Sequence, residues 1–271
     1  MSILDTIVAH KLTEVAARKA ELPLAVLRER LAEAPQPRDF LAALLSSARP
    51  APRVIAEIKR RSPSKGELRP GLDAAELARI YEQNGASAIS VLTDKHFFGG
   101  SLDDMRNVRA ATTLPLLRKD FVIDPYQIYE ARMAGADAIL LIAAILAPEQ
   151  IAAYSHLAAE LGMAALVEVH NRAELTSALT ANANLIGINN RDLHTFNVTL
   201  DTTRAFRPLI PPGVVVVSES GIYTQADRES LQDLNVDALL VGESLLVSDD
   251  IAQATRVISG ISSQVSERSV A

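Results

Sequence analysis

The chain contains no cysteine and no tryptophan, and its other aromatic residues are few. Without cysteine it has no disulfide framework, no thiolate nucleophile and no cysteine-based zinc site. The histidines are scattered, and no two stand at the spacing of a metal-ligand pair: His10, His96, His156, His170 and His194. The composition therefore argues against thiol chemistry and against a metal centre.

Long apolar runs are also absent, since no stretch approaches the roughly 20 residues that a membrane-crossing helix needs. The first residues include Asp5 and lack both the basic start and the cleavage site of a signal peptide. The formal charge of −6 comes from both signs mixed along the chain, whereas a nucleic-acid binder needs a basic face. We expect a cytoplasmic protein that binds neither nucleic acid nor membrane. The net charge still allows a local cationic site that binds an anionic ligand.

Apolar residues make up 48% of the 271 residues, which is enough for a sizeable core. They are mainly alanine, leucine, isoleucine and valine, as is typical of parallel strands buried on both faces. The length suits one large α/β domain or two small ones.

Residues 1–47 differ from the rest, because proline-punctuated stretches there carry apolar side chains at helical spacing. The spacing is seen in Leu4, Ile7, Val8, Leu12 and Val15, in Leu24, Leu27 and Leu31, and in Phe40, Leu41, Leu44 and Leu45. Charged residues, Lys11 among them, lie between the first set. We expect one domain over residues 1–271: a helical extension over 1–47, a main body over 53–261, and a frayed tail over 262–271.

From residue 53 onward, short aliphatic runs alternate with helical segments. The runs are Val54–Lys59, Ser87–Leu92, Leu114–Arg118, Asp137–Ile142, Ala164–Val169, Leu185–Asn189, Val214–Ser218 and Asp237–Val241. Helix-capping residues stand before several of the helical segments: Asp73, Ser101, Asp124 and Thr224. Eight βα units predict a closed (β/α)8 barrel. The competing open sheet usually has fewer strands and a glycine-rich first turn, which the Lys59–Ser64 segment is not.

Polar side chains stand at the carboxyl ends of five of these strands, where the active site of such a barrel lies. Strand alternation directs the following side chains into the barrel mouth: Glu57, Lys59, Lys119, Glu168, Asn189 and Glu219. A purely structural ion pair is the alternative for Glu57 and Lys59, but a shared rim favours a catalytic constellation.

The turns after the last two strands predict a phosphate site. Ser220-Gly221 and Gly242-Glu243-Ser244 follow them, the second just before a short helical run at Leu245–Val247. Barrels often bind phosphate through backbone amides of these loops. Ser62, just past the first strand, is a candidate to add a hydroxyl.

Other rim residues have less specific interpretations. Phe97, Phe98 and Phe121 either line an aromatic pocket or cap the core, with Phe121 the better candidate for the pocket. His170 and His194 have no obvious acidic partner and are interpreted as loop residues. Arg60 and Arg61 are expected to be solvated or paired with acidic surface groups.

The strand-end segments resemble those of the indole-3-glycerol-phosphate synthase family. The similar segments are residues 55–66, 91–101, 117–121, 166–170, 186–193 and 217–221, and they occur in the same order over nearly the whole chain. The N-terminal pattern Ile3-Leu4-Asp5…Ile7-Val8-Ala9…Lys11 is similar to the helical extension of that family.

The resemblance implies a carboxy-lyase of tryptophan biosynthesis that needs no metal or organic cofactor. Its substrate would be 1-(2-carboxyphenylamino)-1-deoxyribulose 5-phosphate, converted to indole-3-glycerol phosphate with loss of carbon dioxide and water. Lys119 would be the general acid, Lys59 a partner of the substrate carboxylate and a second acid, and Glu168 the base. Glu57 would aid proton transfer, while Glu219 and Asn189 would steady developing positive charge and sugar hydroxyls.

The resemblance also implies binding roles. Ser62, Gly221, Gly242 and Glu243 match the phosphate site, and Ser220 stays a candidate from its place in the turn before Gly221. Phe98, Phe121, Leu140 and Leu193 are candidates to line the anthranilate pocket, and Arg191 either binds the substrate carboxylate or braces its loop.

Three alternatives remain open at this stage. A phosphoribosylanthranilate isomerase is similar in fold, but its family uses a cysteine base, which this chain lacks. A Schiff-base aldolase would use Lys59 or Lys119 as nucleophile. A catalytically inactive barrel serving as a binding module would not need charged strand ends. The expected binding partner is a small phosphosugar substrate. We expect the protein to be a monomer, with a homodimer as the alternative.

Overall fold

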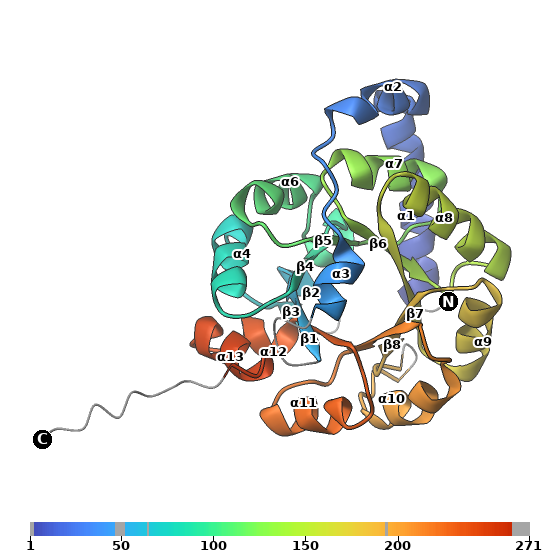
Figure 1. Cartoon of the computed structure of the whole chain (residues 1–271). Helices are drawn as coiled ribbons and strands as arrows, with labels where there is room; N and C mark the ends of the chain where they lie inside the picture. The colour runs from blue at the N-terminus through green and yellow to red at the C-terminus, as the bar shows by residue number, and fades with distance from the viewer. Residues whose placement is uncertain (1–2, 47–51, 64, 193–194, 262–271) are drawn as a thin grey trace, which may run out of the picture.

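The computed structural model describes residues 3–46, 52–63, 65–192 and 195–261 (Figure 1). Eight parallel strands within these ranges close into a barrel, because β10 pairs with β1. They are β1 (Arg53–Ile58), β4 (Ala88–Leu92), β5 (Leu116–Lys119), β6 (Ala138–Ile142), β7 (Ala164–Val169), β8 (Leu185–Asn189), β9 (Val215–Glu219) and β10 (Ala238–Val241). The predicted (β/α)8 barrel is confirmed.

A helix of 6 to 13 residues follows each strand and covers the outside of the barrel. These helices are α4 (Ala74–Gln83), α6 (Leu102–Ala111), α7 (Pro125–Met133), α8 (Pro148–Glu160), α9 (Arg172–Thr180), α10 (Asp201–Phe206), α11 (Gln225–Gln232) and α13 (Ile251–Ile258). The predicted caps Asp73, Ser101, Asp124 and Thr224 each accept a hydrogen bond from a backbone amide of the helix that follows. In the described ranges, no helix combines the length and apolar character that a membrane crossing requires.

Shorter elements decorate the rim. The β2 (Arg61–Ser62) and β3 (Gly66–Glu67) pair follows β1, and α5 (Lys95–Phe98) follows β4. The short helix after β10 is α12 (Glu243–Leu246), so it begins two residues before the predicted Leu245–Val247 run. The described residues also contain two 3₁₀ turns, η1 (Arg30–Glu33) and η2 (Arg207–Leu209).

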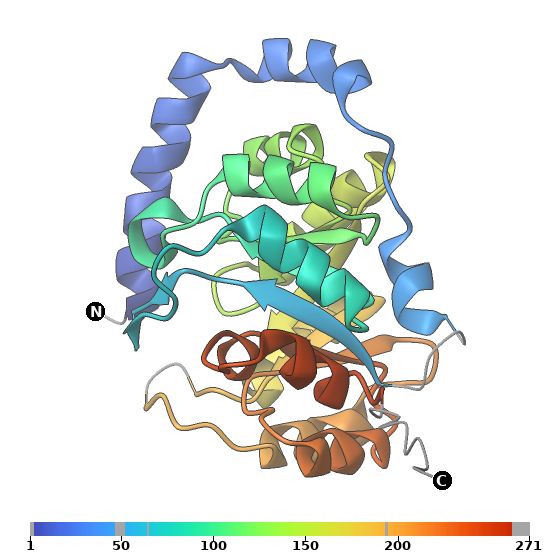
Figure 2. The ribbon, with the colours of Figure 1, turned by 90° about the vertical axis from the view of Figure 1, so that its left-hand side faces the viewer.

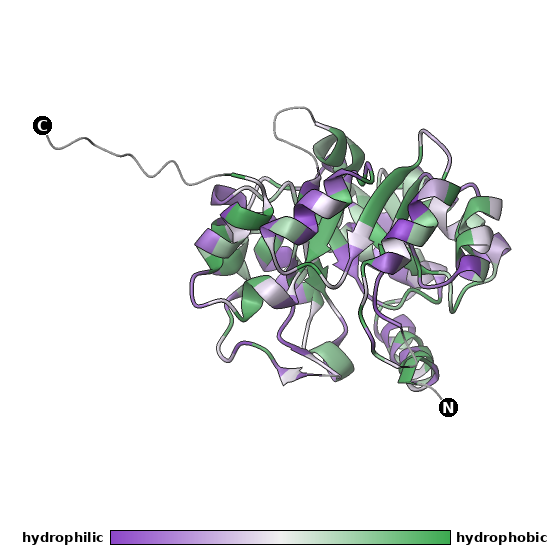
Figure 3. Cartoon of the chain, turned by 90° about the horizontal axis from the view of Figure 1, so that it is seen from below, coloured by the Kyte–Doolittle hydropathy of each residue, from purple (hydrophilic) through white to green (hydrophobic). Residues whose placement is uncertain are grey.

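Strand alternation divides the core into two shells. Inward-facing residues such as Ile55, Leu117 and Leu166 fill the barrel, whereas outward-facing ones such as Ile58 and Val167 pack against the helices. Figure 1 shows the helices surrounding the strands, and Figure 3 shows that the strands are mainly hydrophobic while the helices carry both hydrophobic and hydrophilic residues. The strand ends are thereby held on a rigid scaffold.

The predicted N-terminal extension is helical, with α1 (Ile3–Glu21), α2 (Leu24–Glu29) and α3 (Phe40–Leu45). Figure 2 shows that the extension begins with α1 near the arrowhead end of the strands and passes around the outside of the barrel. It reaches the opposite end of the strands at α3. There Phe40 and Leu44 join the interior cluster of the barrel and close its floor.

The buried face of α1 differs from the predicted one. Ile7, Lys11 and Val15 are buried at a spacing of four residues, while Leu12 is 61% exposed. The reason is that the Lys11 ammonium meets carboxylates of the barrel, which fixes the rotation of the helix.

Candidate active site

A single pocket at the carboxyl ends of the strands gathers the residues predicted for the site. It is lined by Glu57, Lys59, Ser62, Phe98, Lys119, Phe121, Leu140, Glu168, Asn189, Arg191, Glu219, Ser220, Gly221, Gly242 and Glu243. Leu193 and His194 lie outside the described residues. Residues distant in sequence thus surround a common space, as the strand parity predicts.

Two groups of ion pairs occupy the floor of this pocket. The ammonium of Lys119 lies 2.6 Å from Glu168 and 3.0 Å from Glu219. Lys59 lies 2.6 Å from Glu57, its neighbour on the same face of β1. All five side chains are at least four-fifths buried, so their charges interact through a poorly screening medium.

The pKa values of Lys119, Glu168 and Glu219 shift in different directions. Burial alone would lower the pKa of Lys119, but Glu168 and Glu219 raise it above its usual range, so the ammonium keeps its charge. Burial opposes ionisation of Glu168 too, yet Lys119 and His170 hold its pKa well below normal. Burial and the nearby Glu168 charge raise the pKa of Glu219 to about 8, against the opposing pull of Lys119. Near neutral pH the cluster therefore holds an ionised and a mainly protonated carboxyl.

His170 is part of this cluster, which corrects its interpretation as a loop residue without an acidic partner. Its Nε2 lies 3.1 Å from Glu168 and its Nδ1 lies 3.0 Å from Glu174. These carboxylates outweigh burial and raise the pKa of the imidazole to about 10. This acidic partner could have been predicted from Glu174. It lies in the first turn of α9, four residues after His170, and can reach back past the Asn171 cap.

Two glycines allow backbones to approach the acidic side chains closely. A β-carbon at Gly187 would overlap Oε1 of Glu219. One at Gly242 would lie 2.7 Å from Oε1 of Glu57, closer than real side-chain contacts allow. The glycines therefore make room for the carboxylates of the neighbouring strands.

The end of β9 has an unusual backbone. Ser220 is left-handed at φ 66°, and Gly221 follows at φ 78°. The buried Asn190 amide donates to the carbonyls of Glu219 at 3.0 Å and of Ser220 at 3.1 Å. Such strain persists only where surrounding contacts hold it, and it is frequent at ligand-binding turns. Asn190 lies in the 186–193 segment noted for its resemblance to the family, but this role was not predicted from the sequence.

The predicted phosphate end of the pocket contains both charge signs. The Glu243 carboxylate lies 3.5 Å from Arg191 and 3.7 Å from Lys65. The main chain of the Gly221 and Gly242 turns lines the same end. Two cations and closely approachable backbone make this end suitable for an anion, although Glu243 competes for the cations.

The pocket lining also contains apolar side chains. The rings of Phe98 and Phe121 have centroids 5.9 Å apart, and Leu140 lines the same pocket. Phe97 instead packs edge-on against His10 and His96. The pocket lining also includes Ile3, Leu4 and Ile7 of α1, which were not predicted as site residues from the sequence.

The remaining predicted arginines have structural partners. Arg60 donates to both carboxylate oxygens of Asp104 at 2.8 Å, as the paired alternative predicts. Arg61 donates to the carbonyls of Lys95 and His96. Within the described ranges, no group of three or more histidine and acidic side chains is arranged to hold a metal ion.

The fold and the charged rim define the protein as a (β/α)8-barrel enzyme. Among solved structures, a 3-hexulose-6-phosphate synthase from Salmonella typhimurium matches with a TM-score of 0.63 at 13% identity, covering 77% of this chain and 97% of that one. A thiamine phosphate pyrophosphorylase from Pyrococcus furiosus matches with a TM-score of 0.59 at 18% identity, covering 78% and 95%. Similarity at this level supports the barrel fold alone.

The family is established by sequence. The family model described as indole-3-glycerol phosphate synthase matches residues 4–258, so the chain belongs to that family. An indole-3-glycerol phosphate synthase of Dehalococcoides mccartyi is 53% identical over 257 residues, covering 94% of this chain and 98% of the relative. One from Roseiflexus sp. is 49% identical over 267 residues, covering 96% and 98%. The resemblance noted in the strand-end segments is confirmed, and with it the carboxy-lyase class.

Proposed function

We propose that this chain converts 1-(2-carboxyphenylamino)-1-deoxyribulose 5-phosphate into indole-3-glycerol phosphate. Family membership supports the activity, and the pocket supports the substrate. Its phosphate would lie at the Ser62, Ser220-Gly221 and Gly242-Glu243 end. Its benzene ring would lie against Phe98, Phe121 and Leu140. The reaction would take place in the cytoplasm, in a monomer whose site comes from one chain.

Ring closure is the first chemical step. The aromatic carbon that bears the carboxylate attacks the ketone carbon, and the ketone oxygen accepts a proton to become a hydroxyl. Lys119 would supply this proton, since two carboxylates hold its ammonium within the pocket. Lys59 would pair with the substrate carboxylate until carbon dioxide leaves and the aromatic electrons are restored.

Dehydration completes the indole. A base removes a proton from the ring-closed intermediate, and the hydroxyl departs as water after protonation by an acid. Glu168 would be the base, since its low pKa keeps it ionised. Lys59 would serve as the second acid, and Glu57, 2.6 Å away, would return its proton. Separated pKa values in one site are the usual sign of such paired acid and base roles.

Arg191 and Asn189 have supporting roles in this scheme. Arg191 lies 3.5 Å from Glu243, which favours bracing of the phosphate loop over direct contact with the substrate carboxylate. The side-chain oxygen of Asn189 accepts from the Arg191 amide at 3.0 Å. This bond leaves the Asn189 amide nitrogen for a sugar hydroxyl.

The single observation that carries the proposal is the position of the Lys119 ammonium between Glu168 and Glu219 on the pocket floor. The test is incubation of the purified protein with the synthetic carboxyphenylamino substrate, followed by ultraviolet and fluorescence detection of the indole product. Product formation by wild type, with none by Lys119→Ala, is expected. Absence of product from folded wild-type protein would contradict the proposal. A borohydride-trapped covalent adduct with substrate would favour an aldolase instead.

A further inference from the structure

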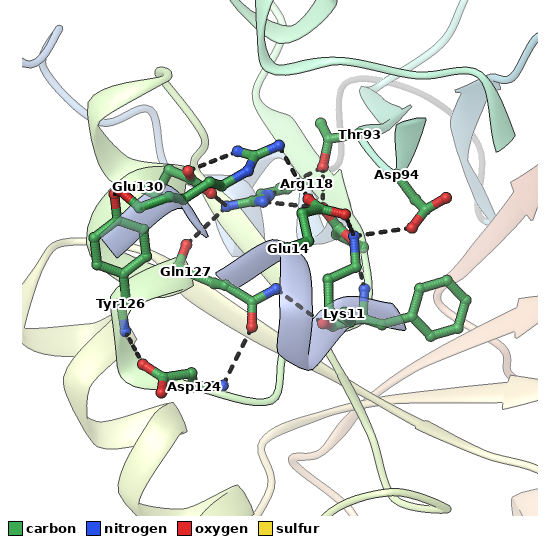
Figure 4. Close-up of polar contacts among 12 residues, drawn as sticks. Lys11, Glu14, Thr93, Asp94, Arg118, Asp124, Tyr126, Gln127 and Glu130 are labelled. Carbon is green, nitrogen blue, oxygen red and sulfur yellow. Dashed lines mark hydrogen bonds and ion pairs between the residues drawn. The ribbon is translucent and has the colours of Figure 1, made fainter. Parts of the chain in front are cut away.

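A buried cation outside the pocket lining joins the N-terminal helix to the barrel rim. Lys11 of α1 is fully buried, and its ammonium lies 2.8 Å from Asp94, 2.9 Å from Asp120 and 2.9 Å from Glu14. Figure 4 shows Lys11 reaching from α1 towards Asp94 and towards the Arg118 network of β5. The scheme for the reaction makes no use of this cluster.

The two barrel carboxylates belong to segments that carry pocket residues. Asp94 caps α5 by accepting from the Phe97 amide at 2.7 Å, and α5 presents Phe98 to the pocket. Asp120 directly follows Lys119 and accepts from the Phe121 amide at 2.8 Å. Lys11 therefore contacts the supports of both phenylalanine rings and the residue next to the proposed acid.

Asp120 is itself fixed from several sides. It accepts from Thr93 at 2.6 Å and from Arg118 at 2.9 Å, both buried. Arg118 in turn lies 2.9 Å from Glu130 of α7, and Glu130 lies 2.6 Å from Arg18 of α1. The cluster thus connects α1 with the ends of β4 and β5 by two routes.

The same face of α1 reaches the pocket. Ile3 and Ile7, which precede Lys11 by eight and four residues, line the pocket. Residues four apart on a helix share one face, so the Lys11 contacts fix the depth and rotation at which these apolar side chains meet the mouth.

The energetics argue for a geometric role. Burying an ammonium among carboxylates often gives no stability over well-packed apolar residues, whereas removal of one partner leaves an uncompensated buried charge. Burial would lower the pKa of Lys11, but Asp120 and Asp94 raise it, so it stays charged. An apolar residue in place of Lys11 would cover the barrel equally well but would not specify the depth and rotation of α1.

We infer that Lys11 is a positioning residue, which holds α1, the Phe98 segment and the Lys119–Phe121 segment in the arrangement that receives the substrate ring. The inference rests on the proposed function for its kinetic effect. The arrangement itself is a property of the substrate-free protein and can be measured separately.

The kinetic test compares Lys11→Met with Lys19→Met, each at a temperature where circular dichroism shows the variant folded. Lys19 is the matched control, because it pairs α1 with Asp124 at 2.6 Å on the exposed side, away from the pocket. Lys11→Met is expected to lower kcat/KM by about 10²-fold, the effect of a misplaced reacting group, with kcat reduced as well as KM raised. Lys19→Met is expected to keep wild-type kinetics. Wild-type kinetics in folded Lys11→Met would overturn the inference.

Amide hydrogen exchange without substrate gives a second readout. Exchange at residues 94–98 and 119–121 is expected to be faster in Lys11→Met than in wild type and Lys19→Met. Unchanged exchange in Lys11→Met would overturn the inference. A wild-type protein that made no indole product would count against the proposed function alone, because the exchange measurement does not depend on activity. If Lys11→Met does not fold, Asp94→Asn takes its place, since asparagine keeps the helix cap but loses the charge facing Lys11. It should show the same changes, and wild-type kinetics and exchange would again overturn the inference.

Discussion

The Nε2 atom of His170 lies 3.1 Å from Oε1 of Glu168, while the other oxygen of that carboxylate contacts Lys119 at 2.6 Å. Each oxygen of the proposed base therefore has its own cation. When Lys119 gives up its proton during ring closure, Glu168 loses the main opposite charge that keeps its pKa low. Its basicity should rise just before the step that needs a base.

Removal of the Glu168 charge should impair catalysis with little change in shape. Glu168→Gln is expected to lower kcat by about 10²-fold or more, the usual contribution of a proton-transfer group. Single-turnover kinetics on the purified variant would measure this. A rate near wild type would remove Glu168 from the role of base.

Lys119→Ala should abolish indole formation while the protein stays folded. Without the ammonium, the opposing pull of Lys119 on the pKa of Glu219 is lost, so the Glu219 carboxyl should hold its proton more firmly beside the ionised Glu168. Product detection and circular dichroism together check the prediction. Normal turnover by this variant would show that the acid lies elsewhere.

The pKa of about 8 for Glu219 predicts a pH dependence. Below that value Glu219 is protonated and can donate a hydrogen bond, whereas its role in steadying positive charge would need the ionised form. We expect kcat/KM to fall as the pH rises through about 8. Glu219→Gln, which mimics the neutral form, should retain activity and lose this transition. A rise in kcat/KM through the same range would instead favour the ionised role.

His170 predicts a pH-dependent contribution to stability. Its pKa is raised from 6.5 to about 10 in the folded protein, so folding favours the protonated imidazole. The stabilisation is fully present below the unfolded value and is lost as the pH rises through about 10. Near neutral pH, wild type should melt at a higher temperature than His170→Asn, and the gap should close at high pH. A difference in melting temperature that does not depend on pH would contradict a protonated His170 paired with Glu168 and Glu174.

The contact between Gly187 and Glu219 predicts a backbone requirement. Gly187→Ala places a methyl group on Oε1 of Glu219 and should move that carboxyl away from Lys119. We expect a reduced kcat in a folded protein. Gly213→Ala is the steric control, because nothing lies within 4 Å of its added carbon, although its left-handed backbone costs some stability. Equal kinetics in the two variants would show that the Glu219 position is not critical.

The barrel and its rim could be predicted because they depend on local periodicity. Strand alternation directs Glu57 and Lys119 inward whatever their distant neighbours are. Repeated apolar runs of similar spacing imply the eightfold closure, which then gathers strand ends that are far apart in the chain.

The contacts of Lys11 could not be predicted in this way. Its partners Asp94 and Asp120 lie more than 80 residues away in the sequence, and no pattern marks a lysine for burial among them. The left-handed Ser220, held by Asn190, is similarly set by tertiary hydrogen bonds rather than by its own backbone preference.

The floor of the barrel has a consequence for biosynthesis. Phe40 and Leu44 are translated before any strand that they cover, and β1 gains its second neighbour only when β10 has been made. On the ribosome, these early apolar side chains are fully enclosed only after the late strands have completed the interior cluster that they join. During that interval they are a natural target for chaperones that bind exposed hydrophobic segments.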